Sequence, residues 1–223
     1  MRRPTISVIT PAHPARARNG KLLRAQKSVL AQTTLPDAHC VAMDLDSQGA
    51  APTRQRALMM AQTDWVAFLD SDDLFMPRHL ELCMKHAQET GADFVYSWFK
   101  ILQESADGAF NVVEGDSRGD SVFPLTHFTN DWDPENPIET TITTLVRTEL
   151  AKEVGFETLD RGEANSGEDR YFTLGCMAAG AKISHLKRKT WFWSHHQLPN
   201  RRPGNTSGIA GRGDDGIEPL LTY

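Results

Sequence analysis

The chain has 223 residues, of which 39% are hydrophobic, and a net charge of −5. This length and composition are those of a globular domain that can bury its own core without disulfides or a structural metal. The acidic balance argues against general nucleic-acid binding, because such proteins are usually basic. We expect no transmembrane segment, and no apolar signal-peptide core follows Met1-Arg2-Arg3, so the expected location is cytoplasmic.

The first hundred residues alternate between strand-like and helix-like patterns. The first strand is expected to stop at Pro11, and the third helix to begin near Pro77 and stop at Gly91. This rhythm predicts an α/β fold with a Rossmann-like, mostly parallel sheet flanked by helices. The expected strands are 6–10, 39–43, 65–69 and 94–99, and the expected helices are 22–32, 54–61 and 77–90.

The alternation breaks after residue 102. Residues 104–139 contain nine acidic residues and Arg118 as the single arginine or lysine, which predicts a loop-rich insertion. From Pro199 the chain is rich in Gly, Arg, Asn and Pro, which predicts a flexible tail. In between, we expect strands at 140–146, 183–186 and 190–193 and helices at 149–154 and 168–179.

Three carboxylates follow the buried strand 65–69, in the run Asp70-Ser71-Asp72-Asp73. Ligands of open α/β sheets bind at the carboxyl ends of strands. Adjacent carboxylates repel one another unless a cation offsets their charge, and Mg²⁺ or Mn²⁺ is the natural partner beside phosphate oxygens. The alternative is a solvated acidic turn that precedes the next helix.

Carboxylates also stand at two other positions where a ligand could be bound. Asp44 and Asp46 end the preceding strand, where they could accept hydrogen bonds from a base or ribose, or simply form a turn. Glu168 and Asp169 open a helix, where one could act as a general base or merely cap the helix.

Two basic positions complete the candidate set. Arg54 follows the Asp44 turn and suits phosphate pairing, with surface solvation as the alternative. His195 and His196 follow a Trp-rich strand, and one of them could contact a metal or a phosphate, or both could be surface residues.

Six segments in order resemble a known family. They are Ile6-Ser7-Val8-Ile9-Thr10-Pro11, Ser28-Val29-Leu30-Ala31-Gln32-Thr33, Val41-Ala42-Met43-Asp44, Phe68-Leu69-Asp70-Ser71-Asp72-Asp73, Gly167-Glu168-Asp169 and Gly180-Ala181-Lys182-Ile183. Together they resemble the family 2 glycosyltransferases of the GT-A fold. The sequence departs from the family where Asp44-Leu45-Asp46-Ser47 replaces Asp-Asp-Gly-Ser, and where His13-Pro14 stands in place of Tyr-Asn.

The resemblance implies a reaction and its residues. A sugar would move from a nucleotide diphosphate sugar, expected to be a UDP-sugar, to a hydroxyl of a glycan, protein or small molecule with inversion, assisted by Mn²⁺ or Mg²⁺. The implied catalytic base is Asp169 and the implied metal ligands are Asp72 and His195. The implied donor-binding residues are Pro11, Asp44, Arg54, Asp70, Ser71 and Asp72.

The resemblance also implies a division of the chain. One domain is expected over residues 1–198, with a nucleotide-sugar-binding half at 1–102 and an acceptor-side half at 103–198. The tail at 199–223 is a candidate lid over the donor.

Two other function classes stay open at the level of sequence. A nucleotidyltransferase also combines an α/β sheet with a metal, but its first strand is usually followed by a Gly-rich loop, and residues 11–20 hold one glycine. A non-catalytic nucleotide-sugar binding module would need no base at Asp169.

Overall fold

The computed structural model describes residues 2–104, 110–116, 142–156 and 167–195. The strands are β1 (Ile6–Ala12), β2 (Ala38–Met43), β3 (Trp65–Phe68), β4 (Leu74–Phe75), β5 (Phe94–Glu104), β6 (Phe110–Asp116), β7 (Thr144–Arg147) and β8 (Ile183–His195). The helices are α1 (Pro14–Arg18), α2 (Lys21–Leu30), α3 (Ala50–Met59), α4 (His79–Thr90), α5 (Thr148–Val154) and α6 (Glu168–Ala178). Across these residues, no helix has the length and apolarity needed to cross a membrane.

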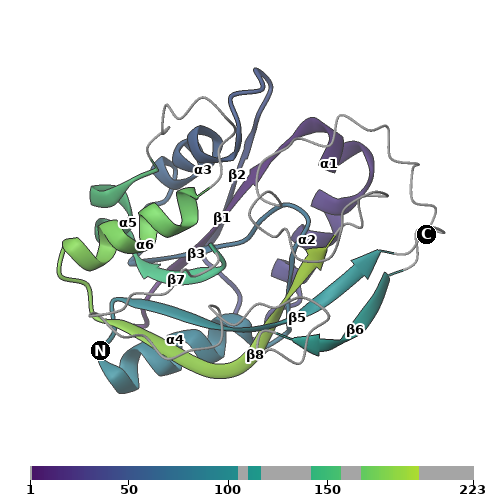
Figure 1. The fold of residues 1–223 in the computed structure, drawn as a ribbon. Coiled ribbons are helices and arrows are strands. Elements are labelled where there is room, and N and C mark those ends of the chain that lie inside the picture. The colour runs from purple at the N-terminus through teal and green to yellow at the C-terminus, as the bar shows by residue number, and fades with distance from the viewer. Residues whose placement is uncertain (1, 105–109, 117–141, 157–166, 196–223) are drawn as a thin grey trace.

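The strands form one twisted sheet in the order β2-β1-β3-β7-β5-β8-β4, with β6 paired to β5 outside this path (Figure 1). Parallel pairing joins β1 to β2 and β3, and β5 to β8, whereas β7 pairs antiparallel with both β3 and β5. This arrangement confirms the expected α/β fold, but the sheet is mixed and not mostly parallel, because β4, β6 and β7 join it by antiparallel pairing. It brings the carboxyl ends of β1, β2 and β3 to the same edge of the sheet.

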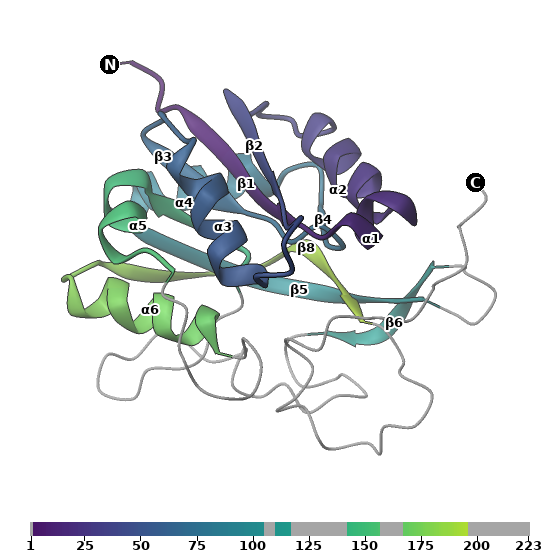
Figure 2. The ribbon, with the colours of Figure 1, turned by 90° about the horizontal axis from the view of Figure 1, so that it is seen from above.

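A hydrophobic core lies on each face of the sheet. On one face Val8 and Ala67 pack with residues of α2 and α4. On the other face Ile9 and Phe68 pack with residues of α3, α5 and α6, and α5 contacts both of the other helices (Figure 2). Covering both faces requires apolar residues at consecutive positions, which explains the continuous apolar run of β3.

β1 does not stop at Pro11 but continues to Ala12. The backbone carbonyl of Ile9 accepts a hydrogen bond from the N–H of Leu69, so the backbone of Ile9 faces β3. Residue 11 faces the same side, two positions further on, where β3 has already ended. Proline therefore leaves no ladder hydrogen bond unmade at this position, and the strand can run through it.

Several elements differ from those expected. β6 lies within the segment predicted to be loop, and β8 is one strand with register shifts opposite Trp98 in place of two strands. Pro77 precedes α4, which begins at His79, and α3 begins four residues before Arg54. The short elements β4 and α1 were not expected, because two to five residues carry no usable periodicity.

A buried polar contact joins α4 to β8. Nδ1 of His79 lies 2.7 Å from Oγ1 of Thr190, and the hydroxyl of Ser97 lies 2.6 Å from the same oxygen. The imidazole of His79 stacks on Phe75 with 4.1 Å between ring centroids. Burial lowers the pKa of His79 to about 3, so this histidine is neutral in the folded protein at ordinary pH.

We predict that Gly175→Ala destabilises the protein. A Cβ at Gly175 would lie 2.5 Å from Cγ1 of Val154, because α6 crosses α5 closely there. Alanine favours a helix over glycine by roughly 0.5–1 kcal/mol, but overpacking costs about 1–3 kcal/mol. Denaturant unfolding should therefore show a net loss. The double variant with Val154→Ala should recover that loss, and a Gly175→Ala protein as stable as the wild type would contradict the close crossing.

Candidate functional site

The carboxylate of Asp44 is held in place at the end of β2. Its Oδ1 accepts a hydrogen bond from the N–H of Gln48 at 2.8 Å, and its Oδ2 accepts one from the N–H of Gly49 at 2.9 Å. Asp44 is buried, whereas Asp46 is exposed. The turn before α3 therefore fixes the orientation of Asp44, and Asp46 does not share its environment.

The run Asp70–Asp73 forms a turn directly after β3, and the backbone N–H of Asp73 donates to the carbonyl of Asp70 at 3.1 Å. Ser71 and Asp73 are buried, whereas Asp70 and Asp72 are partly exposed. The two exposed carboxylates are therefore the ones that a bound ligand can reach.

Asp72 is surrounded by positive charge from the segment that follows β1. Nη2 of Arg16 lies 3.1 Å from Oδ2 of Asp72, and Nη2 of Arg24 donates to the Asp72 carbonyl at 3.5 Å. The arginines offset part of the negative charge of the Asp70–Asp73 turn. The sequence predicted no role in the site for Arg16 or Arg24. Their position shortly after the end of β1 was the signal that could have indicated such a role.

Asp73 connects the same turn to β8. Its Oδ1 accepts a hydrogen bond from the N–H of Ser194 at 2.8 Å, and the Ser194 hydroxyl donates to the Asp72 carbonyl. Burial, together with the charges of Asp72 and Asp70, raises the pKa of Asp73 well above its ordinary value. Asp73 is thus a structural residue of the turn.

Arg54 lies at the centre of the carboxylates, with a side chain that is 2% exposed. Its Nη2 donates to Oδ1 of Asp70 at 2.8 Å, and its Nη1 donates to Oε1 of Glu168 at 3.3 Å. Burial alone would lower the pKa of Arg54, but Asp70, Asp169 and Glu168 raise it above its usual value, so the guanidinium is charged. The guanidinium is thus engaged by carboxylates and is not on the surface.

The first turn of α6 brings two carboxylates to this cation. The side chain of Glu168 is 11% exposed, and that of Asp169 is 28% exposed with Oδ1 3.9 Å from Nη1 of Arg54. Asp169 is thus more open to a ligand, and Glu168 is held more closely. The contact between Arg54 and Glu168 could not be predicted from the sequence, because the two residues are 114 positions apart.

The structure describes the other expected site residues only in part. Pro11 is buried near the end of β1. His195 ends β8, but its side chain and all of residues 196–223, including the candidate lid, lie outside the described part of the chain. Where side chains are described, no group of three His, Cys, Asp or Glu residues could hold a metal ion.

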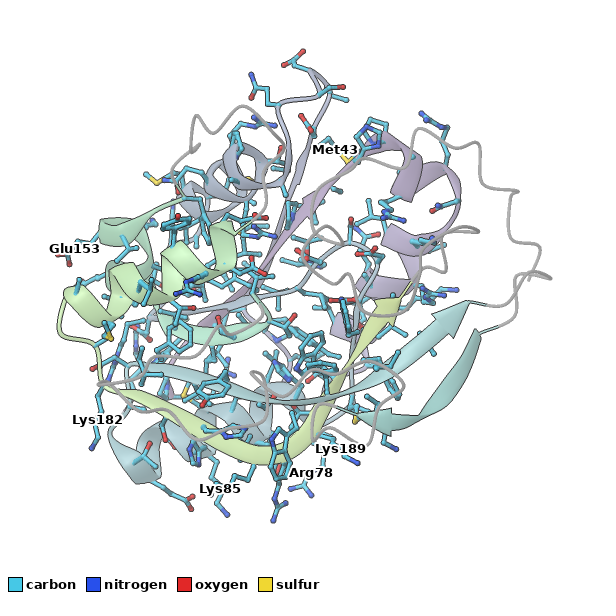
Figure 3. The ribbon with its side chains drawn as sticks, in the orientation of Figure 1. Met43, Arg78, Lys85, Glu153, Lys182 and Lys189 are labelled. Carbon is cyan, nitrogen blue, oxygen red and sulfur yellow. The ribbon has the colours of Figure 1, made fainter. Side chains whose placement is uncertain are left out.

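Other cations lie far from this edge of the sheet. Figure 3 shows Arg78, Lys85, Lys182 and Lys189 projecting from the side of the molecule opposite to Met43, the last residue of β2. These four cations therefore do not contribute to the cluster around Arg54.

Comparison with known proteins places part of the chain in a family. A family model described as Glycosyl transferase family 2 matches residues 45–155. Residues 45–155, just under half of the chain, thus belong to glycosyl transferase family 2. A curated relative in this comparison, an uncharacterized glycosyltransferase of Rickettsia bellii (strain RML369-C), is 31% identical over 78 residues, which cover 35% of this chain and 11% of the relative.

Solved structures similar to this chain include TarS of S. aureus. TarS 1-349 in complex with UDP-GlcNAc superposes with a TM-score of 0.63 at 19% identity, covering 96% of this chain and 63% of that chain. TarS 1-349 in complex with UDP gives a TM-score of 0.60 at 18% identity, with coverages of 86% and 60%. The likeness at this identity shows the GT-A fold. The chain thus spans less than two thirds of these relatives.

Proposed function

We propose that this family 2 chain transfers a sugar from a nucleotide diphosphate sugar to an acceptor hydroxyl. The observation that carries the proposal is the meeting of Asp70, Glu168 and Asp169 around the buried Arg54, beside the strand end that carries Asp44. Donor-binding and base residues would then share one edge of the sheet. Family membership supports this reading.

A UDP-sugar is the donor that we propose. The similar TarS structures were solved with UDP and with UDP-GlcNAc, which supports a uridine nucleotide here. Asp44 would accept a hydrogen bond from the base, since the backbone N–H groups of Gln48 and Gly49 fix its carboxylate. Asp70 would accept hydrogen bonds from the ribose, with Pro11 and Ser71 alongside.

Asp72 is the proposed protein ligand of Mg²⁺ or Mn²⁺. It is the carboxylate of the turn that is partly exposed and that pairs with Arg16, whereas Asp73 is buried and Asp70 is bound by the buried Arg54. One carboxylate fits an ion that takes most of its ligands from phosphates and water, as Mg²⁺ does. His195 would be a second ligand. A bound metal stabilises the negative charge that develops on the departing diphosphate.

Asp169 is the proposed general base. Its partly exposed carboxylate would take the proton from the acceptor hydroxyl as the oxygen attacks the anomeric carbon. Attack on one side while the diphosphate leaves from the other is a single displacement, which inverts the anomeric configuration. Arg54 supplies the positive charge that favours the ionised form of this carboxylate.

Donor turnover tests the proposal against its rivals. The protein is incubated with a set of UDP-sugars, Mn²⁺ and hydroxyl acceptors, and both UDP release and glycosylated product are measured. Formation of both supports a glycosyltransferase. Release of pyrophosphate from UTP and a sugar phosphate would indicate a nucleotidyltransferase, and binding without turnover would indicate a binding module.

We predict that Asp72→Asn removes the metal-dependent part of UDP binding while the fold is retained. Wild-type protein should bind UDP at least about tenfold more tightly with Mn²⁺ than with EDTA, which is about 1.4 kcal/mol. Asp72→Asn should bind equally in both buffers, because a neutral amide lacks the negative charge that attracts the cation. Calorimetry measures the affinities, with the exposed Glu89→Gln on α4 as the charge-matched control. An unchanged response to EDTA in Asp72→Asn would exclude Asp72 as the ligand.

A further inference from the structure

Arg54 joins two segments that lie far apart in the sequence. One guanidinium nitrogen holds Asp70, which follows β3, and the other holds Glu168, the first residue of α6. A guanidinium is planar and presents its donors in a fixed geometry, so it constrains both carboxylates at once. The guanidinium thereby helps to set the distance between the end of β3 and the start of α6.

The first turn of α6 has no side-chain cap of its own. The N-cap residue is Gly167, with φ 108°, and it makes no side-chain capping hydrogen bond. The ion pair between Glu168 and Arg54 instead attaches this turn to α3, the helix that carries Arg54.

An aromatic cluster beneath Arg54 strengthens the ion pairs. The ring centroid of Phe156 lies 5.3 Å from Cζ of Arg54, and Phe156 stacks on Phe172 of α6 with 4.5 Å between centroids. Phe68 of β3 contacts both rings edge-on at 5.4 Å. Charged hydrogen bonds are stronger beside apolar surfaces that exclude water.

We propose that Arg54 is a positioning residue that locks the start of α6 onto the end of β3, with Glu168 as its partner, so that Asp169 is held at a fixed place relative to the donor. This inference rests on the proposed function. It replaces the phosphate-pairing role that the sequence suggested for Arg54, because both terminal nitrogens of the buried guanidinium are engaged by carboxylates. Glu168 is then the carboxylate that Arg54 binds, and Asp169 is the carboxylate that acts on the acceptor hydroxyl.

The kinetic test uses Glu168→Gln and Arg54→Lys. A displacement of about 1 Å can cost a factor of about 10² in rate. We therefore expect kcat to fall up to 10²-fold in both variants, while the Kd for UDP with Mn²⁺ changes less than about twofold in Glu168→Gln, which keeps the pair between Arg54 and Asp70. The control is the exposed pair Arg78–Glu81 on the opposite edge, and Arg78→Lys and Glu81→Gln should leave both constants unchanged. Weaker UDP binding at unchanged kcat would overturn the proposal, because it would make Arg54 a donor ligand.

Hydrogen exchange tests the lock without any activity. The N–H of Tyr171 donates to the carbonyl of Gly167 at 3.0 Å and so reports the first turn of α6. Its exchange should accelerate at least about tenfold in Glu168→Gln and stay unchanged in Glu81→Gln. Unchanged exchange in Glu168→Gln would overturn the proposal even if the protein transfers sugar.

A wild-type protein without transferase activity would instead refute the proposed function, and the exchange result would still decide whether Arg54 locks α6. If Arg54→Lys does not fold, Glu168→Gln alone carries both tests.

Discussion

Asp169→Asn is expected to lower the rate of sugar transfer by a factor of about 10²–10⁴, the usual loss when one general base is removed. Asparagine keeps the shape of the side chain but cannot accept the proton of the acceptor hydroxyl. Donor affinity should change little, because the base acts on the acceptor. Product formation under saturating donor measures the rate, and calorimetry with UDP measures the affinity.

The design of this experiment separates Asp169 from its neighbours. Glu153→Gln, on the outer surface of α5, removes one negative charge and should leave the rate unchanged (Figure 3). Glu168→Gln should lower the rate less than Asp169→Asn does, because Glu168 acts through Arg54. A wild-type rate in Asp169→Asn together with inactive Glu168→Gln would assign the base to Glu168, and two active variants would exclude the mechanism.

Acidification is expected to destabilise the protein through His79. Its pKa is about 3 in the folded protein and near 6.5 when the chain is unfolded. Below pH 6.5 the unfolded state therefore binds a proton that the folded state excludes, and stability falls as pH falls from 6.5 towards 3. The contribution of His79 to this loss is about 3 kcal/mol by pH 4.

A variant isolates the share of His79 from that of the carboxylates. In His79→Asn the amide can still reach the Thr190 hydroxyl but cannot titrate. Denaturant unfolding at pH 7 and pH 4 should give a difference about 3 kcal/mol smaller than in the wild type, whatever the stability at pH 7. His86→Asn, on the same helix and less buried, should flatten the profile less. An equal pH dependence of wild type and His79→Asn would show that His79 is not held neutral.

The sequence could predict the parts of the site that lie within one strand and its following turn. Asp44 and Asp70 each follow an apolar run, so the end of a strand marks them. The roles within the Asp70–Asp73 turn could not be predicted, because burial of Asp73 depends on Ser194 of a strand more than a hundred residues away. For the same reason the sequence predicted phosphate pairing for Arg54, with surface solvation as the alternative, and could not indicate its distant partner Glu168.

The fold was predictable to a similar extent. The 12-residue helix α4 and the continuous apolar run of β3 lie close to where they were expected. Pairing between strands is decided by contacts that no local pattern encodes, and this applies to β6 and to the antiparallel insertion of β7.

The position of β7 has a consequence for how the chain folds as it is synthesised. β7 lies between β3 and β5, yet residues 144–147 leave the ribosome after both of those strands. Until then β3 and β5 each present an unpaired edge, a state that invites association with other chains. The centre of this sheet is thus closed late in translation, and a nascent chain that stalls before residue 144 would need a chaperone to shield those edges.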